Sequence, residues 1–214
     1  MTNLGVLYEA GKGVPQDYVK AYEWYEKAAA KDEALAMTNL GALYQDGHGV
    51  PQDYAKARDW YEKAAAKDSA VAMVTLGLFY ANGYGVPQDY GKAREFFEKA
   101  AAKDNADAMV GLGALYQDGH GVPQDFAKAR EWYEKAAAKD DASGMYGLGL
   151  FYAKGQGVPQ DYGKAGEWFE KAAARGDARA KTAVEQLSAG QHTPSAQPPN
   201  QKLPGARTHV HGVR

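Results

Sequence analysis

Apolar residues recur along this chain with the spacing of amphipathic helices. From Ala34 to Tyr44 they lie three or four positions apart, at Ala36, Met37, Leu40, Leu43 and Tyr44. This spacing predicts a helix, which we name helix A. A second stretch, from Tyr54 to Ala66, has the same spacing and predicts helix B, with an apolar face of Tyr54, Ala57, Trp60, Tyr61 and Ala64.

The residues between the two helices predict tight connections. Gly47 ends helix A, and the following Gly49 and Pro51 indicate a loop. Asp53 is placed to cap helix B by accepting a hydrogen bond from a free N–H group in its first turn. Asp68 follows helix B, where a left-handed backbone is common, and the same repeat position holds Asp32, Asp104, Asp140 and Gly176. The next residue is a preferred N-cap in most copies, so about two residues link helix B to the next helix A.

The whole unit occurs five times at a fixed step of 36 residues. Its most constant phrase is Gly-x-Gly-Val-Pro-Gln-Asp, with prolines at Pro15, Pro51, Pro87, Pro123 and Pro159. A fixed period of this length is typical of a solenoid, in which each unit contacts only its neighbours. We therefore predict an all-α solenoid over residues 1–188, with five A/B pairs and a final helix over 177–188. The polar residues Lys181, Glu185 and Ser188 suit that last helix to cap the array.

Two further features qualify this repeat. A glycine lies in the middle of every helix A, at Gly5, Gly41, Gly77, Gly113 and Gly149. Each costs about 1 kcal/mol relative to alanine, so we expect a close helix–helix approach with no room for a Cβ atom. The copies also follow a two-repeat period, since residues 41–68 and 113–140 differ at two positions only. Gene duplication is the simplest explanation of this longer period.

The repeat resembles the Sel1-like repeat family. The resemblance rests on A-M-x-x-L-G-x-L-Y at 36–44 and on G-x-G-V-P-Q-D-Y-x-K-A at 47–57, continuing to the alanines at 64–66. It implies a right-handed α/α superhelix related to tetratricopeptide repeats, and an adaptor or scaffold function that is common among bacterial proteins at or outside the envelope. A cysteine-rich branch of the family is linked to penicillin binding, and this chain has no cysteine.

The positions that differ between copies indicate a partner-binding stripe. By the same resemblance, helix A lines the concave surface, and the variable positions fall on one stripe of that helix. The predicted binding residues are Asn39, Ala42, Asp46, Thr75, Leu78, Asn82, Asp118, Leu150 and Lys154. Leu78 and Leu150 are the strongest candidates, because we expect an exposed leucine with no role in packing. An alternative is that unconstrained surface positions have drifted.

Composition limits the other classes of function. The net charge of −2 and the lack of a basic stripe argue against nucleic-acid binding, and no apolar run reaches the ~20 residues that cross a membrane.

Residues 189–214 hold four prolines and no acidic residue, which predicts a disordered tail. Met1 shares its repeat position with Met37, so the chain opens inside a repeat, which indicates a misassigned start or a fragment. The compartment and the oligomeric state are therefore left open.

No arrangement of residues predicts catalysis or a cofactor. His48 and His120 occupy equivalent loop positions roughly 20 Å apart, at ~10 Å per packed layer, too far to share a metal ion. His209 and His211 form only a weak metal motif, and the paired glycines follow a helix rather than the strand of a nucleotide site. The preferred function is a non-catalytic scaffold that binds a protein or peptide. The alternative is a penicillin-recognising activity, which the missing cysteines and nucleophile disfavour.

Overall fold

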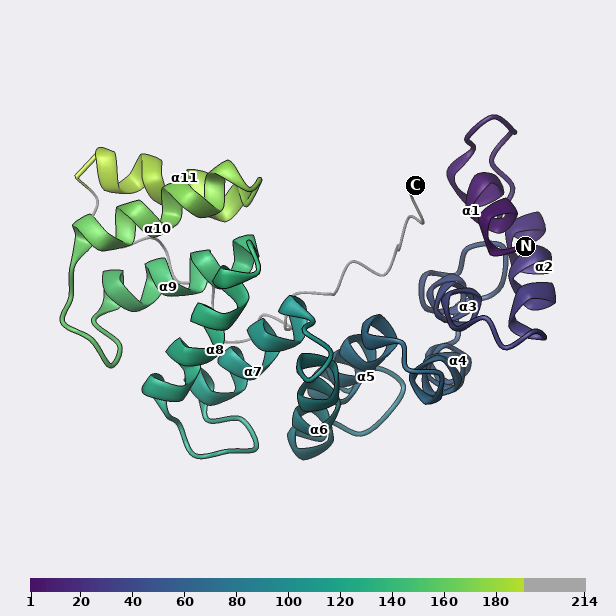
Figure 1. Cartoon of the computed structure of the whole chain (residues 1–214), viewed down its shortest axis with the longest axis horizontal. Helices are drawn as coiled ribbons and strands as arrows, with labels where there is room; N and C mark the ends of the chain where they lie inside the picture. Colours follow the sequence, from purple (N-terminus) through teal and green to yellow (C-terminus); the bar gives the residue numbers. More distant parts are fainter. Residues whose placement is uncertain (191–214) are drawn as a thin grey trace. The chain divides into compact units, whose positions relative to one another are not determined.

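A computed structural model describes residues 1–190, which form eleven α-helices and no β-strand (Figure 1). Helix A and helix B alternate from the first repeat to the fifth, and one further helix follows. The helices are α1 (Thr2–Ala10), α2 (Tyr18–Ala29), α3 (Ala34–Asp46), α4 (Tyr54–Ala66), α5 (Ala70–Asn82), α6 (Tyr90–Ala101), α7 (Ala106–Asp118), α8 (Phe126–Ala138), α9 (Ala142–Lys154), α10 (Tyr162–Ala174) and α11 (Ala178–Ser188). The predicted all-α solenoid of five repeats and a terminal helix is confirmed.

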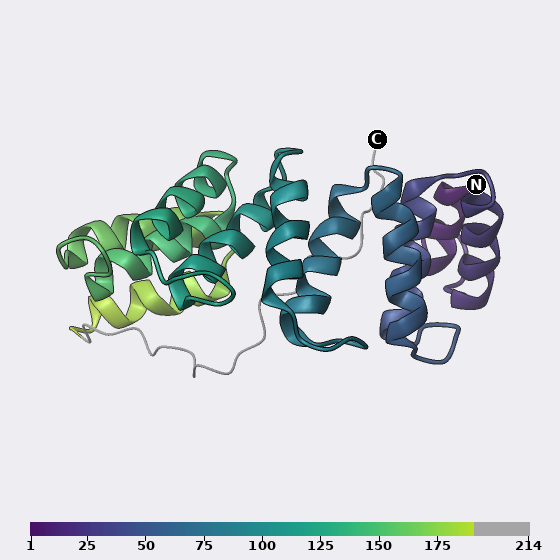
Figure 2. The same cartoon turned by 90° about the horizontal axis from the view of Figure 1, so that it is seen from below.

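The chain divides into two compact units, the first formed by residues 1–100 and the second beginning at Ala101. Within each unit, an A helix packs against the B helix of its own repeat and against the B helix of the repeat before it. In the first unit α3 contacts both α2 and α4, and in the second α9 contacts both α8 and α10 (Figure 2). Helices α3 and α9 are therefore each enclosed by two B helices.

The predicted helix ends are confirmed by the cap geometry. The carboxylate of Asp53 accepts hydrogen bonds from the backbone N–H groups of Ala55 and Lys56, each at 3.0 Å. Helix α3 ends at Asp46, two residues later than the apolar pattern indicated, because the left-handed Gly47 (φ 71°) terminates it. A left-handed backbone at this point lets the free N–H of the cap residue bond back to the last turn.

The junction between repeats also has the predicted geometry. The four aspartates after the B helices have φ angles between 61° and 68°, at Asp32, Asp68, Asp104 and Asp140. The next residue caps the following A helix: Ser69 accepts a hydrogen bond from the N–H of Ala72, whereas Glu33 makes no such side-chain bond. Three residues between α4 and α5, and four between α2 and α3, reverse the chain between helices, rather than the two that the sequence predicted.

The mid-helix glycines lie where the sequence predicted a close approach. A Cβ atom on Gly41 would lie 2.7 Å from the ring of Tyr61, and one on Gly113 would lie 2.8 Å from the ring of Tyr133. Real Cβ atoms do not approach other atoms this closely. The neighbour is an aromatic ring of the B helix in the same repeat, which fills the space that a side chain on the A helix would need.

The core follows from this packing of rings against small residues. Tyr61 and Phe97 are fully buried, and the B-helix alanines at the equivalent of Ala57 and Ala64 have no exposed surface in any repeat. Alanine lets the helix axes come close, so the rings of one layer reach the leucines and phenylalanines of the next.

Helix α11 closes the second unit with a polar outer side. Lys181, Glu185 and Ser188 are all exposed, as expected for a capping helix. Its N-cap Asp177 has a side chain that is 6 % exposed and pairs with Arg179 at 2.6 Å. The tail that was predicted to be disordered lies, from residue 191 onward, outside the described residues, as do His209 and His211.

Candidate interaction surface

Four of the nine predicted binding residues are buried. Asn39 is 4 % exposed, Ala42 1 %, Thr75 2 % and Leu78 7 %. The expectation that Leu78 is an exposed leucine is therefore wrong. Leu78 lies on an A helix that packs on more than one side, so its side chain is enclosed although it does not belong to the apolar face of the helical pattern.

The position of Asn39 and its equivalents lies against the preceding B helix. A Cβ atom on Gly147, the equivalent residue of α9, would lie 3.0 Å from the ring of Tyr133 on α8. Burial raises the pKa of Tyr25 on α2. A side-chain hydrogen bond with Asn39 has the opposite, smaller effect. These residues serve the interface between repeats.

The accessible part of the stripe lies at the ends of the A helices. Asp46, Asn82, Asp118 and Lys154 are the last residues of α3, α5, α7 and α9; Asn82 is partly exposed and the other three are exposed. Leu150, one turn earlier on α9, is partly exposed. Each unit thus presents its own short polar patch, formed by Asp46 and Asn82 in the first and by Asp118, Leu150 and Lys154 in the second.

The patch in the second unit is electrostatically organised. Desolvation raises the pKa of Asp118, while the nearby charges of His120 and Lys154 oppose that rise. Asp118 also stands at the C-terminal end of α7, where the helix dipole disfavours a carboxylate. An additional positive charge beside Asp118 would favour its ionised form.

Aromatic stacking holds the loops beside the first patch. The ring of Tyr18 stacks on His48 with centroids 4.5 Å apart, and Tyr54 stacks on Tyr84 at 5.6 Å. In both pairs the second residue occupies the variable position of the Gly-x-Gly loop, and the first begins the B helix of the preceding repeat. His48, which the sequence placed too far from His120 to share a metal ion, packs on the aromatic ring of Tyr18 in this loop.

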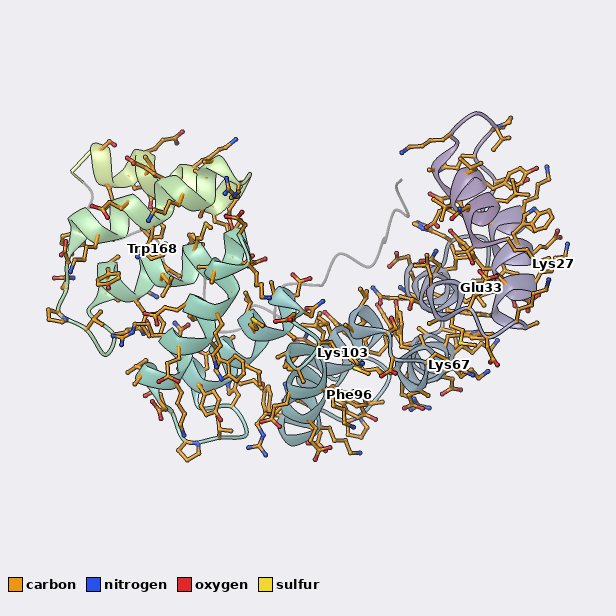
Figure 3. The ribbon with its side chains drawn as sticks, viewed as in Figure 1. Lys27, Glu33, Lys67, Phe96, Lys103 and Trp168 are labelled. Atoms are coloured by element: carbon orange, nitrogen blue, oxygen red, sulfur yellow. The ribbon has the colours of Figure 1, made fainter. Side chains whose placement is uncertain are left out.

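A shallow depression on the B-helix side was not predicted. It lies between α4 and α6 and has a volume of about 230 Å³; its lining residues are Glu62, Ala65, Ala66, Met73, Phe96 and Lys99. Figure 3 labels Phe96 on α6. Lys99 lies over the ring of Phe96, 5.3 Å from its centroid. The one feature of the sequence that could have indicated this depression is Phe96, because the other four repeats have tryptophan at that position. The helical pattern had instead assigned the position to the core.

Between residues 1 and 190, no three histidine, aspartate or glutamate side chains are grouped so as to hold a metal ion. Burial raises the pKa of Tyr61 and Tyr133 well above the ordinary value, so both hydroxyls stay neutral. Among the same residues, no helix is long and apolar enough to cross a membrane.

Comparison with known proteins identifies the family. The Sel1 repeat model matches five consecutive segments that together cover residues 1–177, namely 1–33, 34–69, 70–105, 106–141 and 142–177. The chain belongs to the Sel1 repeat family. No curated protein matches the chain.

Solved structures of bacterial proteins share this architecture. A Sel1 repeat protein from Oxalobacter formigenes has 34% sequence identity and a TM-score of 0.83, over 91% of this chain and 80% of the other. A protective antigen of uropathogenic Escherichia coli with an SLR fold has 38% identity and a TM-score of 0.75, over 89% of this chain. This chain spans only 42% of that antigen. The immunity protein Pa5087 from Pseudomonas aeruginosa has 28% identity and a TM-score of 0.56, over 77% of this chain and 60% of the other.

Proposed function

We propose that the chain is a non-catalytic scaffold that binds a protein or peptide partner at the ends of its A helices. Sel1 repeat proteins generally mediate protein interactions, and the similarity to a Pseudomonas immunity protein is consistent with such a role. The observation that carries the proposal is the patch of Asp118, Leu150 and Lys154, which remains accessible while four of the nine predicted residues, Asn39, Ala42, Thr75 and Leu78, are buried.

The chemistry of this patch specifies what a partner needs. A basic side chain would neutralise Asp118, an apolar side chain would cover Leu150, and an acidic side chain would pair with Lys154. The fixed repeat core supplies a rigid support, so we expect little backbone change on binding. Exposed ion pairs contribute little affinity individually, and a few anchors such as Leu150 would supply most of it.

A charge-reversed variant tests the proposal. In the Asp118→Lys, Lys154→Glu variant the two side chains still attract each other and the net charge is unchanged, but a partner meets the opposite pattern. We expect quantitative affinity capture from the source organism to lose specific partners with this variant. Glu131→Lys, Lys181→Glu is the matched control, since both residues are exposed in the same unit and lie away from the patch. Equal recovery of all partners by both variants would exclude the patch.

The penicillin-recognising alternative draws no support from the site. The chain has no cysteine, and the accessible residues of the patch are charged, amide and aliphatic side chains rather than an activated nucleophile with a base. Nitrocefin turnover by the purified chain would revive this alternative.

A further inference from the structure

One position of the B helices holds tryptophan in four repeats and phenylalanine in the third. The tryptophans are Trp24, Trp60, Trp132 and Trp168, and the exception is Phe96 on α6. The depression between α4 and α6 is lined by this phenylalanine. Because a phenyl ring is smaller than an indole, the substitution leaves room at a place that tryptophan occupies in the other repeats.

The exposure of one alanine in each B helix supports this explanation. Ala29 on α2 is 6 % exposed and Ala137 on α8 is 9 % exposed, and in both cases the next B helix carries tryptophan. Ala65, the equivalent residue of α4, is partly exposed and lines the depression together with Phe96. The alanine is therefore covered where the following repeat has tryptophan, and it is accessible where that repeat has phenylalanine.

The walls of the depression are held in place by the core. The ring of Phe96 is stacked on that of Tyr80 from α5, with centroids 5.7 Å apart and an angle of 8° between the planes. Met73, another lining residue, is only 6 % exposed. The depression is thus preformed, and its volume of about 230 Å³ suits a single side chain rather than a drug-sized ligand, which needs roughly 300–1,000 Å³.

Two charged residues of the depression suit an indole ring. In the four repeats with tryptophan, the lysine three positions later lies 4.0–4.5 Å from the centroid of the ring. Lys99 lies 5.3 Å from the smaller ring of Phe96 and lines the depression, so its ammonium group can also reach a ring bound there. Tryptophan is the aromatic side chain that cations prefer. Glu62 on the opposite wall is an exposed carboxylate, and it can accept a hydrogen bond from an indole N–H group.

We propose that this depression binds the side chain of a tryptophan from another polypeptide, packed between Ala65 and Phe96 and within reach of Lys99. A second copy of the chain is a poor source of that side chain. All four tryptophans of the chain already lie beneath lysines of their own repeats. The site lies within the first unit, so it is distinct from the patch at Asp118 and does not depend on it.

Methyl NMR of the full chain tests the proposal directly. The probe is a capped tripeptide, Gly-Trp-Gly, and the control is the same peptide with leucine at its centre. We expect the tryptophan probe to shift the methyl signals of Met73 and Ala65 in a saturable way. The leucine probe should bind about fivefold more weakly or worse, because it lacks the aromatic and cation–π contacts. The methyl signal of Met37, the equivalent of Met73 beside Trp60, should not respond to either probe.

Two reciprocal substitutions locate the site. Phe96→Trp introduces the residue that the other four repeats carry, so it should fold normally and abolish the shifts of Met73. Trp60→Phe should open the equivalent space between α2 and α4, and it should make the methyl signal of Met37 respond to the tryptophan probe. A Met37 signal that stays silent in this variant would contradict the role of tryptophan in filling the position.

Four further results would overturn the proposal. Absence of saturable Met73 shifts would show that the depression does not accept an indole. A leucine probe that binds within fivefold of the tryptophan probe would show an unspecific apolar contact. Shifts that persist in Phe96→Trp would place the probe elsewhere. Dimerisation by light scattering, with Met73 shifts that depend on protein concentration alone, would assign the depression to a second copy.

The site is separable from the proposed partner patch. Asp118→Lys, Lys154→Glu changes residues of the second unit only, and it should leave binding of the tryptophan probe unchanged. Loss of probe binding in that variant would contradict the independence of the two sites. Phe96→Trp should likewise leave the partners of the Asp118 patch unchanged in affinity capture.

Discussion

The hydroxyl of Tyr61 donates a hydrogen bond to Oε1 of Gln45 across the two helices of one repeat, at 3.0 Å. Tyr133 and Gln117 form the same bond at 2.8 Å. Where the tyrosine is replaced by phenylalanine, the glutamine is replaced by alanine, as in Phe97 with Ala81 and Phe169 with Ala153. From the second repeat to the fifth, the chain therefore alternates a hydrogen-bonded pair with an apolar pair at the same place, whereas the first repeat has a hydrogen bond from Tyr25 to Glu9.

The first prediction concerns this pair. Gln45→Ala leaves the buried Tyr61 hydroxyl without its acceptor and should destabilise the fold by about 1–3 kcal/mol. Tyr61→Phe should cost about 1 kcal/mol, because it removes the bond but leaves the more accessible Gln45 to water. The double variant should be close to wild type, since it recreates the pair found in the third and fifth repeats. Urea denaturation of the four proteins measures the coupling, and strictly additive losses would contradict the account.

The second prediction concerns the mid-helix glycines. A Cβ atom on Gly77 would lie 2.5 Å from the ring of Phe97, so Gly77→Leu should destabilise by roughly 3 kcal/mol through overpacking. Gly166→Ala is the matched control in α10, because its nearest neighbour would be a Leu187 methyl at 3.9 Å. That change should stabilise by up to about 1 kcal/mol through helix propensity. Equal effects of the two substitutions in chemical denaturation would show that contact with the ring is not decisive.

The third prediction concerns the left-handed junctions. Asp104 has a φ of 62°, and Asp104→Ala should destabilise by about 1 kcal/mol because alanine adopts this backbone poorly. Asp104→Gly should stay within about 0.5 kcal/mol of wild type, because glycine adopts this backbone without strain. Loss of the exposed pair with Lys139 adds little in either variant. A thermal-unfolding series in which glycine is worse than alanine would refute the backbone explanation.

The fourth prediction concerns acid stability of the terminal helix. Burial tends to raise the pKa of Asp177, but the hydrogen bonds and charge of Arg179, together with backbone N–H groups, lower it below the ordinary value. The stabilisation is complete above the unfolded pKa of about 3.9 and is lost as the pH falls through the lower folded pKa. The stability difference between wild type and Asp177→Asn should therefore be constant from pH 7 to about 5. It should shrink below about pH 4. A difference that disappears already near pH 6 would contradict this assignment.

The sequence predicts this fold well because its determinants are local and repeated. Helix α4 begins at Tyr54 and ends at Ala66 as the apolar pattern indicated, and Asp53 caps it. The sequence also predicted the close helix–helix contact at Gly41, because a glycine within a helix is costly unless a contact requires it. The longer reach of α3, to Asp46, depends on the backbone of Gly47 rather than on the apolar spacing.

The exposed residues of the A helices were harder to predict, because the polarity of a residue does not indicate its exposure when the helix is enclosed by its neighbours. Thr75 is buried, and its hydroxyl donates a hydrogen bond to the carbonyl of Val71 in the previous turn at 3.0 Å. Leu78 is buried beside it, although the equivalent Leu150 is partly exposed. The positions that vary among the copies therefore include two kinds of residue, those that pack between repeats and those that face solvent. Only the three-dimensional structure distinguishes the two kinds.

Site-specific photo-crosslinking tests the central claim of a partner surface at the A-helix ends most directly. A benzoylphenylalanine at Lys154, an exposed position beside Asp118, should form covalent adducts with the partner in cells of the source organism. The same probe at the exposed Lys181 of α11 controls for chance encounters in the same unit. The account predicts defined adducts at 154 that are absent at 181. Adducts at 181 without any at 154 would contradict it.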